Sequence, residues 1–579
     1  MNIRNQLEQK IAEAMQAAGI PENSPAVIKP SARPEFGDYQ ANGIMGAAKK
    51  LKTNPQDLAT KVIQHIDLID IASKVEVAGP GFLNIHLTED WIAENAERAL
   101  ASDRLNIEEV EDPDTVVIDY SGPNLAKEMH VGHLRSTIIG DAMARILTFL
   151  GHKVIRQNHV GDWGTQFGML LTLMEELQAQ GGEISMELSD LEKFYQRAKI
   201  RFDEDPDFAN QARENVVKLQ AGDTEFLALW KQFTEISLSH CEAIYRELNV
   251  LLTPDDVMPE SAYNDDLPVV VAELDKQGLL TRDQGAQCVF MEEFKNKDGS
   301  ITPMIVQKSD GGYLYATTDL AALRHRQNKL GMERGLYVID ARQSLHLKQV
   351  FTASKKAGFV KPETQLEHLA FGTMMGEDGT PFKTRDGGTV KLKELINEAK
   401  QRAYDLVTQK NPELDESNRK EIAKTVGIGS VKYADLSKNR TSDYIFNWDS
   451  MLSFEGNTAP YLQYAYTRIQ SIFRKIGGIE NIDQSIALEL IEPTERQLAL
   501  KLLQFEEAIE SVAKDGTPNI LCNYLFELAG NFMSFYESCP ILNAEVEDFK
   551  HSRLKLSQLT ANTLKTGLDL LGIDVLDQM

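Results

Sequence analysis

The chain has 579 residues, of which 42% are hydrophobic and 26% charged, a globular composition that excludes a largely disordered chain. Because a single compact core stops growing well below this length, we expect several domains. The formal net charge of −26 excludes a uniformly basic surface, so any contact with nucleic acid must come from local basic patches.

The cysteine spacing and the lengths of the apolar runs indicate the cellular compartment of the protein. Cys241, Cys288, Cys522 and Cys539 show no CxxC spacing, and a secreted chain of this size would more typically carry a disulfide framework. The amino-terminal residues mix glutamates with apolar residues, unlike a signal peptide, and no run approaches the roughly 20 apolar residues that cross a bilayer. We expect a reduced, cytoplasmic protein without a membrane partner.

Residues 1–110 predict a small α+β module. A helical pattern opens it, and the strand-like string VEVAGPGFLNIHL lies near its end. The acidic, proline-bearing string EEVEDPD at residues 108–114 is typical of a linker, so we place a boundary there.

Residues 115–173 change to an alternation of strands and helices. TVVIDY is a buried-strand run, the polar string SGPNLAKEMH predicts a loop, and VGHLRSTIIGDAMARILTFLG predicts a helix that ends at Gly151. HKVIRQNHV then predicts a second strand. This order is a βαβ unit with an expected right-handed crossover, which favours a Rossmann-like parallel sheet.

Residues 174–265 are helical and acidic, and we interpret them as an insertion that splits the nucleotide fold. Strand signals resume with QCVFMEEF and ITPMIVQ, and again at GLYVID and LEHLAFG, the last two separated by a helix over about 343 to 358. We therefore place the second half of the parallel sheet in residues 266–390.

The remainder of the chain reads as helical. Residues 391–456 predict helices and a polar loop, and residues 457–579 predict a bundle whose aromatic residues are more typical of core than of a base-stacking platform. The expected fold class is multidomain α/β plus α. It combines a Rossmann-like parallel-sheet domain with a helical insertion, an amino-terminal α+β module and a carboxy-terminal helical bundle.

The string His130-Val131-Gly132-His133 stands where the loop after the first central strand enters a helix. An N-terminal helical turn presents free backbone N–H groups and a partial positive charge, which suits phosphate. Imidazoles at i and i+3 lie on one side of that turn and could both donate hydrogen bonds to phosphoryl oxygens. Gly132 leaves room for a base or ribose to approach the backbone. ATP is the expected ligand.

Two other interpretations of these histidines stay open at this point. The pair could be a helix cap with a solvated neighbour, or two ligands of a zinc site. Zinc needs further ligands and no cysteine lies nearby, so we predict no protein metal site.

Longer strings carry a family resemblance. SGPNLAKEMHVGHLRST followed by QNHVGDWGTQFGMLL resembles the class I aminoacyl-tRNA synthetases and, in this combination, arginyl-tRNA synthetase of bacterial type. The resemblance covers the whole chain, through FGDYQAN and GPGFLNIHL near the amino terminus, YLYATTDLAA and YVIDARQSLHLKQVF in the middle, and NTAPYLQYAYTRI at the start of the bundle.

The second class I signature, the KMSKS loop, would fall near residue 383, where the chain has Pro381-Phe382-Lys383-Thr384-Arg385. Relatives with this departure are thought to use a lysine just ahead of the histidine motif, which here is Lys127. An ammonium there can reach the ATP phosphates as negative charge moves to the departing pyrophosphate. Lys383, on a Gly-rich loop, is the second candidate. For each lysine, an exposed charge without a catalytic role is the alternative.

The resemblance also implies an arginine pocket and the shape of the nucleotide site. A guanidinium needs carboxylates and neutral acceptors. By motif, the arginine-binding residues are Asp119, Asn124, Tyr315, Asp319, Gln343 and His346. His159 and Gly161, with Trp163, would shape the nucleotide pocket. The alternatives are an exposed strand end for Asp119, a helix N-cap for Asp319 and a core position for Trp163.

The implied activity is ATP-dependent attachment of L-arginine to its tRNA through an arginyl-adenylate, so the implied class is an arginine–tRNA ligase of protein synthesis. His130, His133, Lys127 and a magnesium ion carried by ATP would stabilise the reacting phosphate. The implied partners are arginine, ATP and tRNA, with the amino-terminal module on the tRNA elbow and the bundle on the anticodon, and we expect a monomer. Arg468, Arg474 and Lys475 are candidate tRNA contacts, with a solvated helix face as the alternative.

Three rival functions remain possible on the sequence. Another class I synthetase, for cysteine or glutamate, would have no use for the carboxylates of the implied pocket. A small-molecule nucleotidyltransferase would share HxGH but not the long helical carboxy terminus. A catalytically silent RNA-binding relative would not need intact His130, Gly132, His133 and Lys127.

Overall fold

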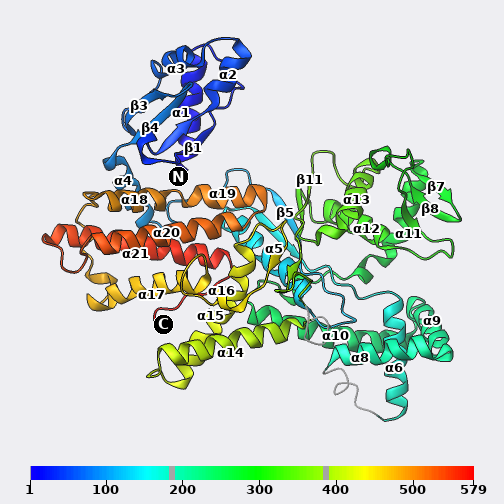
Figure 1. Ribbon diagram of the computed structural model, residues 1–579. Helices are drawn as coiled ribbons and strands as arrows, with labels where there is room; N and C mark the ends of the chain where they lie inside the picture. The colour runs from blue at the N-terminus through cyan, green and yellow to red at the C-terminus, as the bar shows by residue number, and fades with distance from the viewer. Residues whose placement is uncertain (1, 182–189, 383–389) are drawn as a thin grey trace.

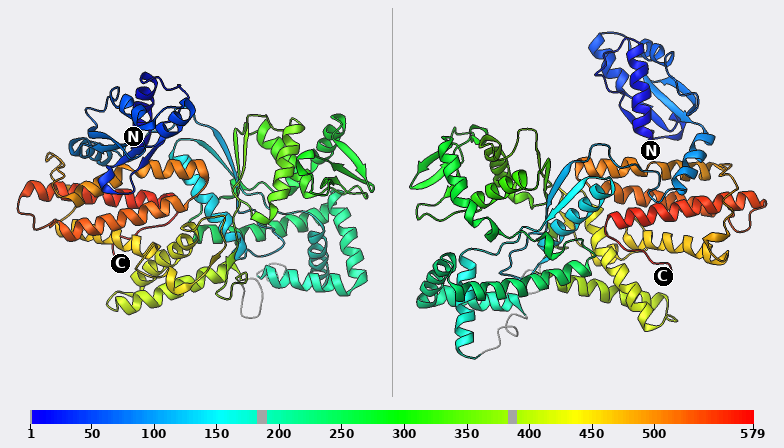
Figure 2. Two further views of the ribbon diagram at one scale, coloured as in Figure 1. Left: turned by 45° about the horizontal axis from the view of Figure 1, so that its top comes forward. Right: turned by 180° about the vertical axis from the view of Figure 1, so that it is seen from behind.

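A computed structural model describes residues 2–181, 190–382 and 390–579. Figure 1 shows a small module at the amino terminus, a central sheet, a large helical body on one side of that sheet and two smaller clusters on the other. Figure 2 shows the same arrangement from two further directions. No helix within the described ranges is long and apolar enough to span a bilayer.

The amino-terminal module is an antiparallel sheet with helices packed on it. Its strand order is β1-β2-β4-β3, and Ile3, Leu7 and Ile11 recur at helical spacing to bury one face of the first helix. The elements are α1 (Ile3–Ala17), β1 (Ile28–Pro30), β2 (Tyr39–Ala41), α2 (Gly43–Leu51), α3 (Pro55–Ile63), β3 (Ala72–Ala78) and β4 (Phe82–Leu87).

The helix that follows the module packs against helices of the body and is therefore part of it. α4 (Glu89–Leu100) begins at Thr88, whose side chain caps it, and it packs on α18 (Pro493–Leu503) and α21 (Glu547–Leu570). The module itself is held to the body by ion pairing, because Arg496 donates two hydrogen bonds to Asp38 at 2.9 and 2.7 Å.

The central sheet is parallel, with strand order β11-β10-β5-β6. The strands β5 and β6 and the helix α5 between them are the βαβ unit that the sequence predicts. In register, Asp119 and Tyr337 end neighbouring strands, so their side chains meet at the carboxyl edge of the sheet. The elements are β5 (Thr115–Asp119), α5 (Val131–Phe149), β6 (Lys153–Gln157), β10 (Arg334–Tyr337) and β11 (Gln365–His368).

One part of the expected sheet is wrong. QCVFMEEF and ITPMIVQ do not join the parallel sheet but form β8 (Ala286–Val289) and β9 (Met304–Gln307), which lie with β7 (Leu280–Asp283) in a separate antiparallel sheet. The physical reason is the connection. Gln284 and Gly285 both have positive φ and make a two-residue hairpin turn, and no crossover helix links β8 to β9. Only GLYVID and LEHLAFG extend the parallel sheet.

Two helical clusters flank the sheet on the side away from the body (Figure 1). The first is the expected insertion, formed by α6 (Thr165–Ala179), α8 (Leu191–Glu204), α9 (Pro206–Gln220) and α10 (Thr224–Glu247). The second packs around the antiparallel sheet and contains the short 3-10 helix η3 (Glu260–Asp266), α11 (Leu267–Lys276), α12 (Tyr315–Asn328) and α13 (Ser344–Lys356). The last of these helices matches the expectation of a helix over about 343 to 358.

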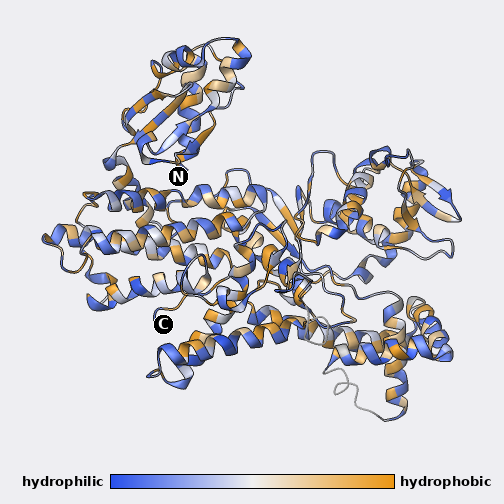
Figure 3. Cartoon of the chain, in the orientation of Figure 1, coloured by the Kyte–Doolittle hydropathy of each residue, from blue (hydrophilic) through white to orange (hydrophobic). Residues whose placement is uncertain are grey.

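The helical body buries α5 against the sheet. α5 contacts β6 on one side and helices of the body on the other. Figure 3 shows hydrophobic and hydrophilic residues alternating along the body helices, as expected of helices that bury one face. The remaining elements are β12 (Met374–Met375), α14 (Leu392–Lys410), α15 (Glu416–Leu436), β13 (Tyr444–Ile445), α16 (Trp448–Met451), α17 (Ala459–Lys475), α19 (Phe505–Asp515) and α20 (Asn519–Ser538).

The expected bundle over residues 457–579 is helical apart from its connections, residues 539–546 and the end of the chain after Leu570. Between α17 and α18 the chain is irregular apart from a single 3-10 turn at Ile479–Asn481. Gly477 and Gly478, with φ of 83° and 124°, end the helix in a conformation that L side chains disfavour. The aromatic residues are mostly core, as expected, since Phe505, Phe532 and Phe535 are buried.

Candidate active site

A cavity of about 540 Å³ opens at the carboxyl edge of the parallel sheet. Its walls come from the end of β5 and the loop after it, the first turn of α5, the loop after β6, η3 and the starts of α12 and α13. This is the edge where parallel α/β folds bind ligands, and the volume lies within the roughly 300 to 1,000 Å³ usual for small-molecule sites.

The first turn of α5 is closed by its two histidines. His130 is the N-cap, and its Nδ1 accepts a hydrogen bond from the Gly132 backbone N–H at 3.0 Å. His133 Nδ1 accepts from the His130 backbone N–H at 3.1 Å, and the ring centres are 4.0 Å apart. The helix cap, one of the two alternative interpretations, is therefore present, but both histidines take part in it reciprocally. Because each Nδ1 accepts, the ring proton of each neutral histidine must be on Nε2.

Both imidazoles are neutral at neutral pH. Burial and the neighbouring His130 lower the pKa of His133 to about 3. Burial, with the charges of Lys127 and Arg342, lowers the pKa of His130 below its ordinary value. Both residues line the cavity, so the turn presents neutral donors to it beside the positive end of the helix.

Gly132 is required by the position of the His130 ring. A Cβ at this position would lie 2.7 Å from His130 Cε1 and 2.9 Å from its Nδ1. The glycine therefore lets the His130 ring fold over the turn and accept the hydrogen bond that fixes its tautomer.

The loop after β6 forms the next wall. His159 lines the cavity, with its Nδ1 3.2 Å from the Met258 carbonyl oxygen, and Gly161 pairs with Asn124 across an isolated β-bridge. Trp163 does not line the cavity. It packs edge-on against Trp230 with ring centres 5.9 Å apart, which is the alternative core role.

Asp119 and Asp319 face the cavity, and each already has a basic partner. Arg326, 1% exposed, donates to Asp119 Oδ2 at 2.8 Å. His346 Nε2 lies 2.6 Å from Asp319 Oδ2, and this hydrogen bond raises the pKa of His346. The alternatives for the two aspartates are wrong, because Asp119 is buried and the N-cap of α12 is Leu314.

The other predicted arginine contacts also reach this cavity. Asn124, Tyr315 and Gln343 line it together with the two aspartates and His346. Asn124 is oriented by the hydrogen bond that its Oδ1 accepts from the Ala126 backbone N–H at 2.9 Å. The Tyr315 side chain is 67% exposed, so its ring lies at the mouth.

Glu260 is a cavity residue that the sequence did not single out. It opens η3, and its backbone N–H donates to the Val160 carbonyl, which docks η3 against the loop after β6. Among the described residues its carboxylate has no hydrogen bond or ion pair. Burial, with the charges of Asp162 and Asp319, raises the pKa of Glu260 to about 8. Only this long-range docking brings the residue to the site, and no local pattern signals it.

Lys127, the first candidate lysine, does not line the cavity. The Lys127 ammonium lies 4.5 Å from the centre of the Tyr195 ring and lines a second, smaller cavity between α10 and α14. Its charge is close enough to lower the pKa of His130. Lys383 lies outside the described residues.

Family models match three parts of the chain. They are described as the arginyl tRNA synthetase N terminal domain over residues 3–87, the class I (R) tRNA synthetase catalytic domain over residues 95–448, and the DALR anticodon binding domain over residues 462–579. Each match contains a separate part of the fold, namely the amino-terminal module, the parallel sheet with its flanking clusters, and the bundle.

Named relatives and solved structures agree with these matches. The arginine–tRNA ligases of Hahella chejuensis and Marinomonas sp. are each 62% identical, over the whole of both chains. The crystal structure of arginyl-tRNA synthetase from Plasmodium falciparum superimposes with a TM-score of 0.86 at 31% identity, covering 100% of this chain and 99% of that one. The Thermus thermophilus enzyme gives 0.83 at 28% identity, covering 100% of both.

The capping geometry predicts the tautomer and charge of both histidines. Nitrogen NMR on histidine-labelled protein should show Nε2 protonated and Nδ1 unprotonated for His130 and His133, with His133 still neutral at about pH 5 because its pKa is depressed. The His133→Gln variant assigns the signals. A proton on Nδ1, or titration of His133 between about pH 5 and about pH 7, would show that the cap does not form in solution.

Proposed function

The chain belongs to the arginyl-tRNA synthetases of class I, and from this premise we propose that its central cavity activates arginine with ATP before the acyl group passes to tRNA. The protein is an arginine–tRNA ligase of protein synthesis and, as a class I synthetase, uses ATP. One observation supports the location most. Neutral imidazole donors at a helix N-terminus and a group of carboxylates line the same cavity.

The ATP end of the cavity is the first turn of α5. Nε2–H of His130 and of His133 donates to phosphate oxygens, and the backbone N–H groups of the turn add the positive end of the helix dipole. Gly132, His159 and Gly161 border this end. Neutral donors suit the step, because they hold the phosphate without taking up or releasing a proton as the charge shifts.

Magnesium enters with ATP. Among the described residues, no group of three or more His, Cys, Asp or Glu side chains is placed to hold a metal ion. The ion bound to ATP neutralises phosphate charge. The chain holds the nucleotide through the α5 turn.

The arginine end is the carboxylate wall. Asp119, Asp319 and, once deprotonated, Glu260 supply negative charge, and Asn124, Tyr315 and Gln343 supply further polar contacts. Arg326 pairs with Asp119 and His346 is hydrogen-bonded to Asp319, so among the described residues Glu260 is the carboxylate of this wall without a basic partner. It provides the net charge that a guanidinium demands, and a forked planar cation can bridge it to Asp319.

The chemistry follows from placing both substrates in one cavity. The arginine carboxylate oxygen attacks the α-phosphorus of ATP, the bond to the bridging oxygen of the β-phosphate breaks, and pyrophosphate leaves with that electron pair. The ribose hydroxyl at the end of tRNA then attacks the acyl carbon of arginyl-adenylate, and AMP departs. No protein nucleophile takes part, so the chain acts by positioning and by charge stabilisation.

Two lysines remain candidates for the charge on departing pyrophosphate. Lys127 is three residues ahead of His130, and its charge acts on that ring. A rotation of its side chain away from Tyr195 would bring the ammonium toward the phosphates. Lys383 is the second candidate. It comes two residues after Pro381, which forms an isolated β-bridge with Met375.

The bundle is the expected anticodon-binding part, since it matches the DALR anticodon binding domain. Arg468, Arg474 and Lys475 lie on α17, and the last two are exposed. Arg468 stacks on Tyr536, with its guanidinium carbon 4.6 Å from the ring centre, and Arg474 donates to the Asp577 carbonyl at 2.6 Å. We propose that these three side chains contact tRNA phosphates.

The proposed working state is a cytoplasmic monomer. All four cysteines are free and buried, which suits a reducing compartment.

Removing a phosphate donor should slow adenylate formation. For His133→Ala we expect kcat of ATP–pyrophosphate exchange, measured with arginine and tRNA, to fall about 10²- to 10³-fold while the fold is retained. His152→Ala is the matched control, because His152 also accepts a backbone N–H, from Asp114, but at the opposite edge of the sheet. A near-normal rate for His133→Ala would contradict the role.

Removing a pocket carboxylate should act on arginine alone. For Asp319→Ala we expect the KM for arginine to rise at least about 30-fold, equivalent to about 2 kcal/mol, because the substrate cation loses its partner. The KM for ATP should change much less. Equal increases in both constants would place Asp319 outside the arginine pocket.

The raised pKa of Glu260 predicts a pH-dependent affinity for arginine. Below about pH 8 the free carboxyl is protonated and must lose its proton when the guanidinium binds, so affinity should fall by up to about tenfold for each pH unit between about pH 8 and about pH 6. Calorimetry in buffers of different ionisation enthalpy would show proton release.

Glu260→Gln should flatten this dependence and weaken binding at about pH 8. Glu292→Gln, on an exposed turn, is the control and should keep the wild-type profile. An unchanged pH dependence in Glu260→Gln would exclude its carboxyl as the titrating group.

A further inference from the structure

A fully buried arginine lies two residues after His133 on α5. Arg135 is 1% exposed, and its Nε lies 3.0 Å from Oδ2 of Asp435, which is equally buried on α15. The pair therefore joins the helix that carries both histidines to a helix of the body. Neither side chain lines the cavity, so neither can contact a substrate there.

The same guanidinium joins two further segments. Its Nη1 donates to the Ser442 carbonyl at 3.2 Å, and the group lies between the rings of Phe371 and Tyr444, 5.8 and 5.2 Å from their centres. Phe371 lines the cavity. Arg135 thus stands where the first part of α5, the cavity wall at Phe371 and the segment after α15 meet.

These two segments also hold each other by backbone hydrogen bonds. The Gly372 N–H donates to the Arg440 carbonyl at 2.9 Å, and the Phe446 N–H donates to the Met375 carbonyl at 2.9 Å, on either side of the parallel pairing of β12 with β13. A shift of the Ser442 segment would therefore carry the Phe371 wall with it. Arg135 fixes that unit relative to the first turn of α5.

Stability alone does not explain an ion pair at this depth. Desolvating two charges costs free energy that their attraction often fails to recover, and apolar residues of similar volume commonly stabilise as well or better. Burial raises the pKa of Asp435 even though Arg135 acts in the opposite direction, which shows the cost of the site. A forked, charged group does provide one defined geometry among three segments, which an apolar side chain does not.

We propose that Arg135 is a positioning residue for the adenylate-forming step, holding the histidine turn of α5 at a fixed place relative to the Phe371 wall through Asp435 and Ser442. This inference rests on the proposed function, because it assumes that the turn binds ATP. Its consequence is kinetic. Displacing a phosphate-binding turn by a fraction of its hydrogen-bond length lowers the rate without removing any substrate contact.

The test is ATP–pyrophosphate exchange by the full chain, with arginine and tRNA present. For Arg135→Met we expect kcat to fall about 10²-fold while the KM for arginine changes less than about twofold. Arg135→Lys keeps the charge but not the fork and should recover only part of the rate. Wild-type kcat in Arg135→Met would overturn the proposal.

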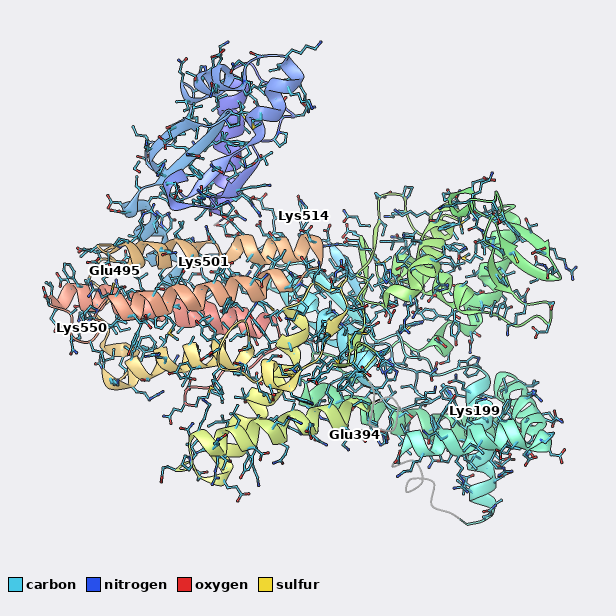
Figure 4. All side chains as sticks on the ribbon, viewed as in Figure 1. Lys199, Glu394, Glu495, Lys501, Lys514 and Lys550 are labelled. Carbon is cyan, nitrogen blue, oxygen red and sulfur yellow. The ribbon has the colours of Figure 1, made fainter. Side chains whose placement is uncertain are left out.

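The chain offers a closely matched control. Arg553 of α21 is also buried, with Nε 2.7 Å from Glu495 and Nη1 donating to the Pro540 carbonyl, so it too joins one carboxylate and one carbonyl. Glu495 is labelled in Figure 4, at the part of the bundle remote from the sheet. Arg553→Met should lower the melting temperature yet leave kcat within about twofold of wild type. An equal loss of kcat in both variants would show a general effect of destabilisation.

A double variant separates positioning from folding. Arg135→Met with Asp435→Leu removes both buried charges and should recover the melting temperature lost in the single variant, because no uncompensated charge remains. We expect its kcat to stay about 10²-fold low. Recovery of kcat together with stability would overturn the proposal. If the wild-type chain showed no arginine-dependent exchange, the proposed function would fail instead, a distinct outcome.

Discussion

The structure of the site depends on how the first turn of α5 satisfies its backbone N–H groups. Two of them donate to the Nδ1 atoms of His130 and His133, so both rings are held over the turn with Nε2 as the donor left for a ligand. The same local hydrogen bonds therefore set the start of the helix, the tautomer of each histidine and the orientation of each ring. Burial keeps the rings neutral, so the turn can bind an anion without changing its own protonation.

The rest of the fold places this turn. Parallel pairing places the carboxyl ends of β5 and β10 side by side, so Asp119 lies next to the point where the chain leaves β10. α12 and α13 add Asp319 and His346, while the body holds α5 from the other side through the buried Arg135–Asp435 pair. The proposed phosphate-binding donors and the proposed cation-binding carboxylates are thus carried by different elements of one fold. Each wall of the cavity is therefore built independently of the other.

The sequence predicts much of this and fails for definable reasons. Strand, loop and helix around His130 are local patterns, and the strings that carry the resemblance lead to Asp319, His346 and Gln343, all of which reach the cavity. Glu260 was missed because its position depends on a backbone contact with Val160, about a hundred residues away. QCVFMEEF and ITPMIVQ were placed in the wrong sheet because a strand pattern does not state its partner, and the hairpin turn at Gln284 and Gly285 decides it. The Arg135–Asp435 pair joins residues about three hundred positions apart, so no spacing could reveal it.

We propose above all that the α5 turn binds the phosphate while the carboxylate wall binds the guanidinium. A crystal structure of the protein with a non-hydrolysable arginyl-adenylate analogue tests it directly. We expect Nε2 of both His130 and His133 within hydrogen-bonding distance of the nucleotide's phosphate-mimicking oxygens, and the guanidinium between Asp319 and Glu260. An analogue bound with its guanidinium away from these carboxylates, or with its phosphate mimic away from the turn, would contradict the account.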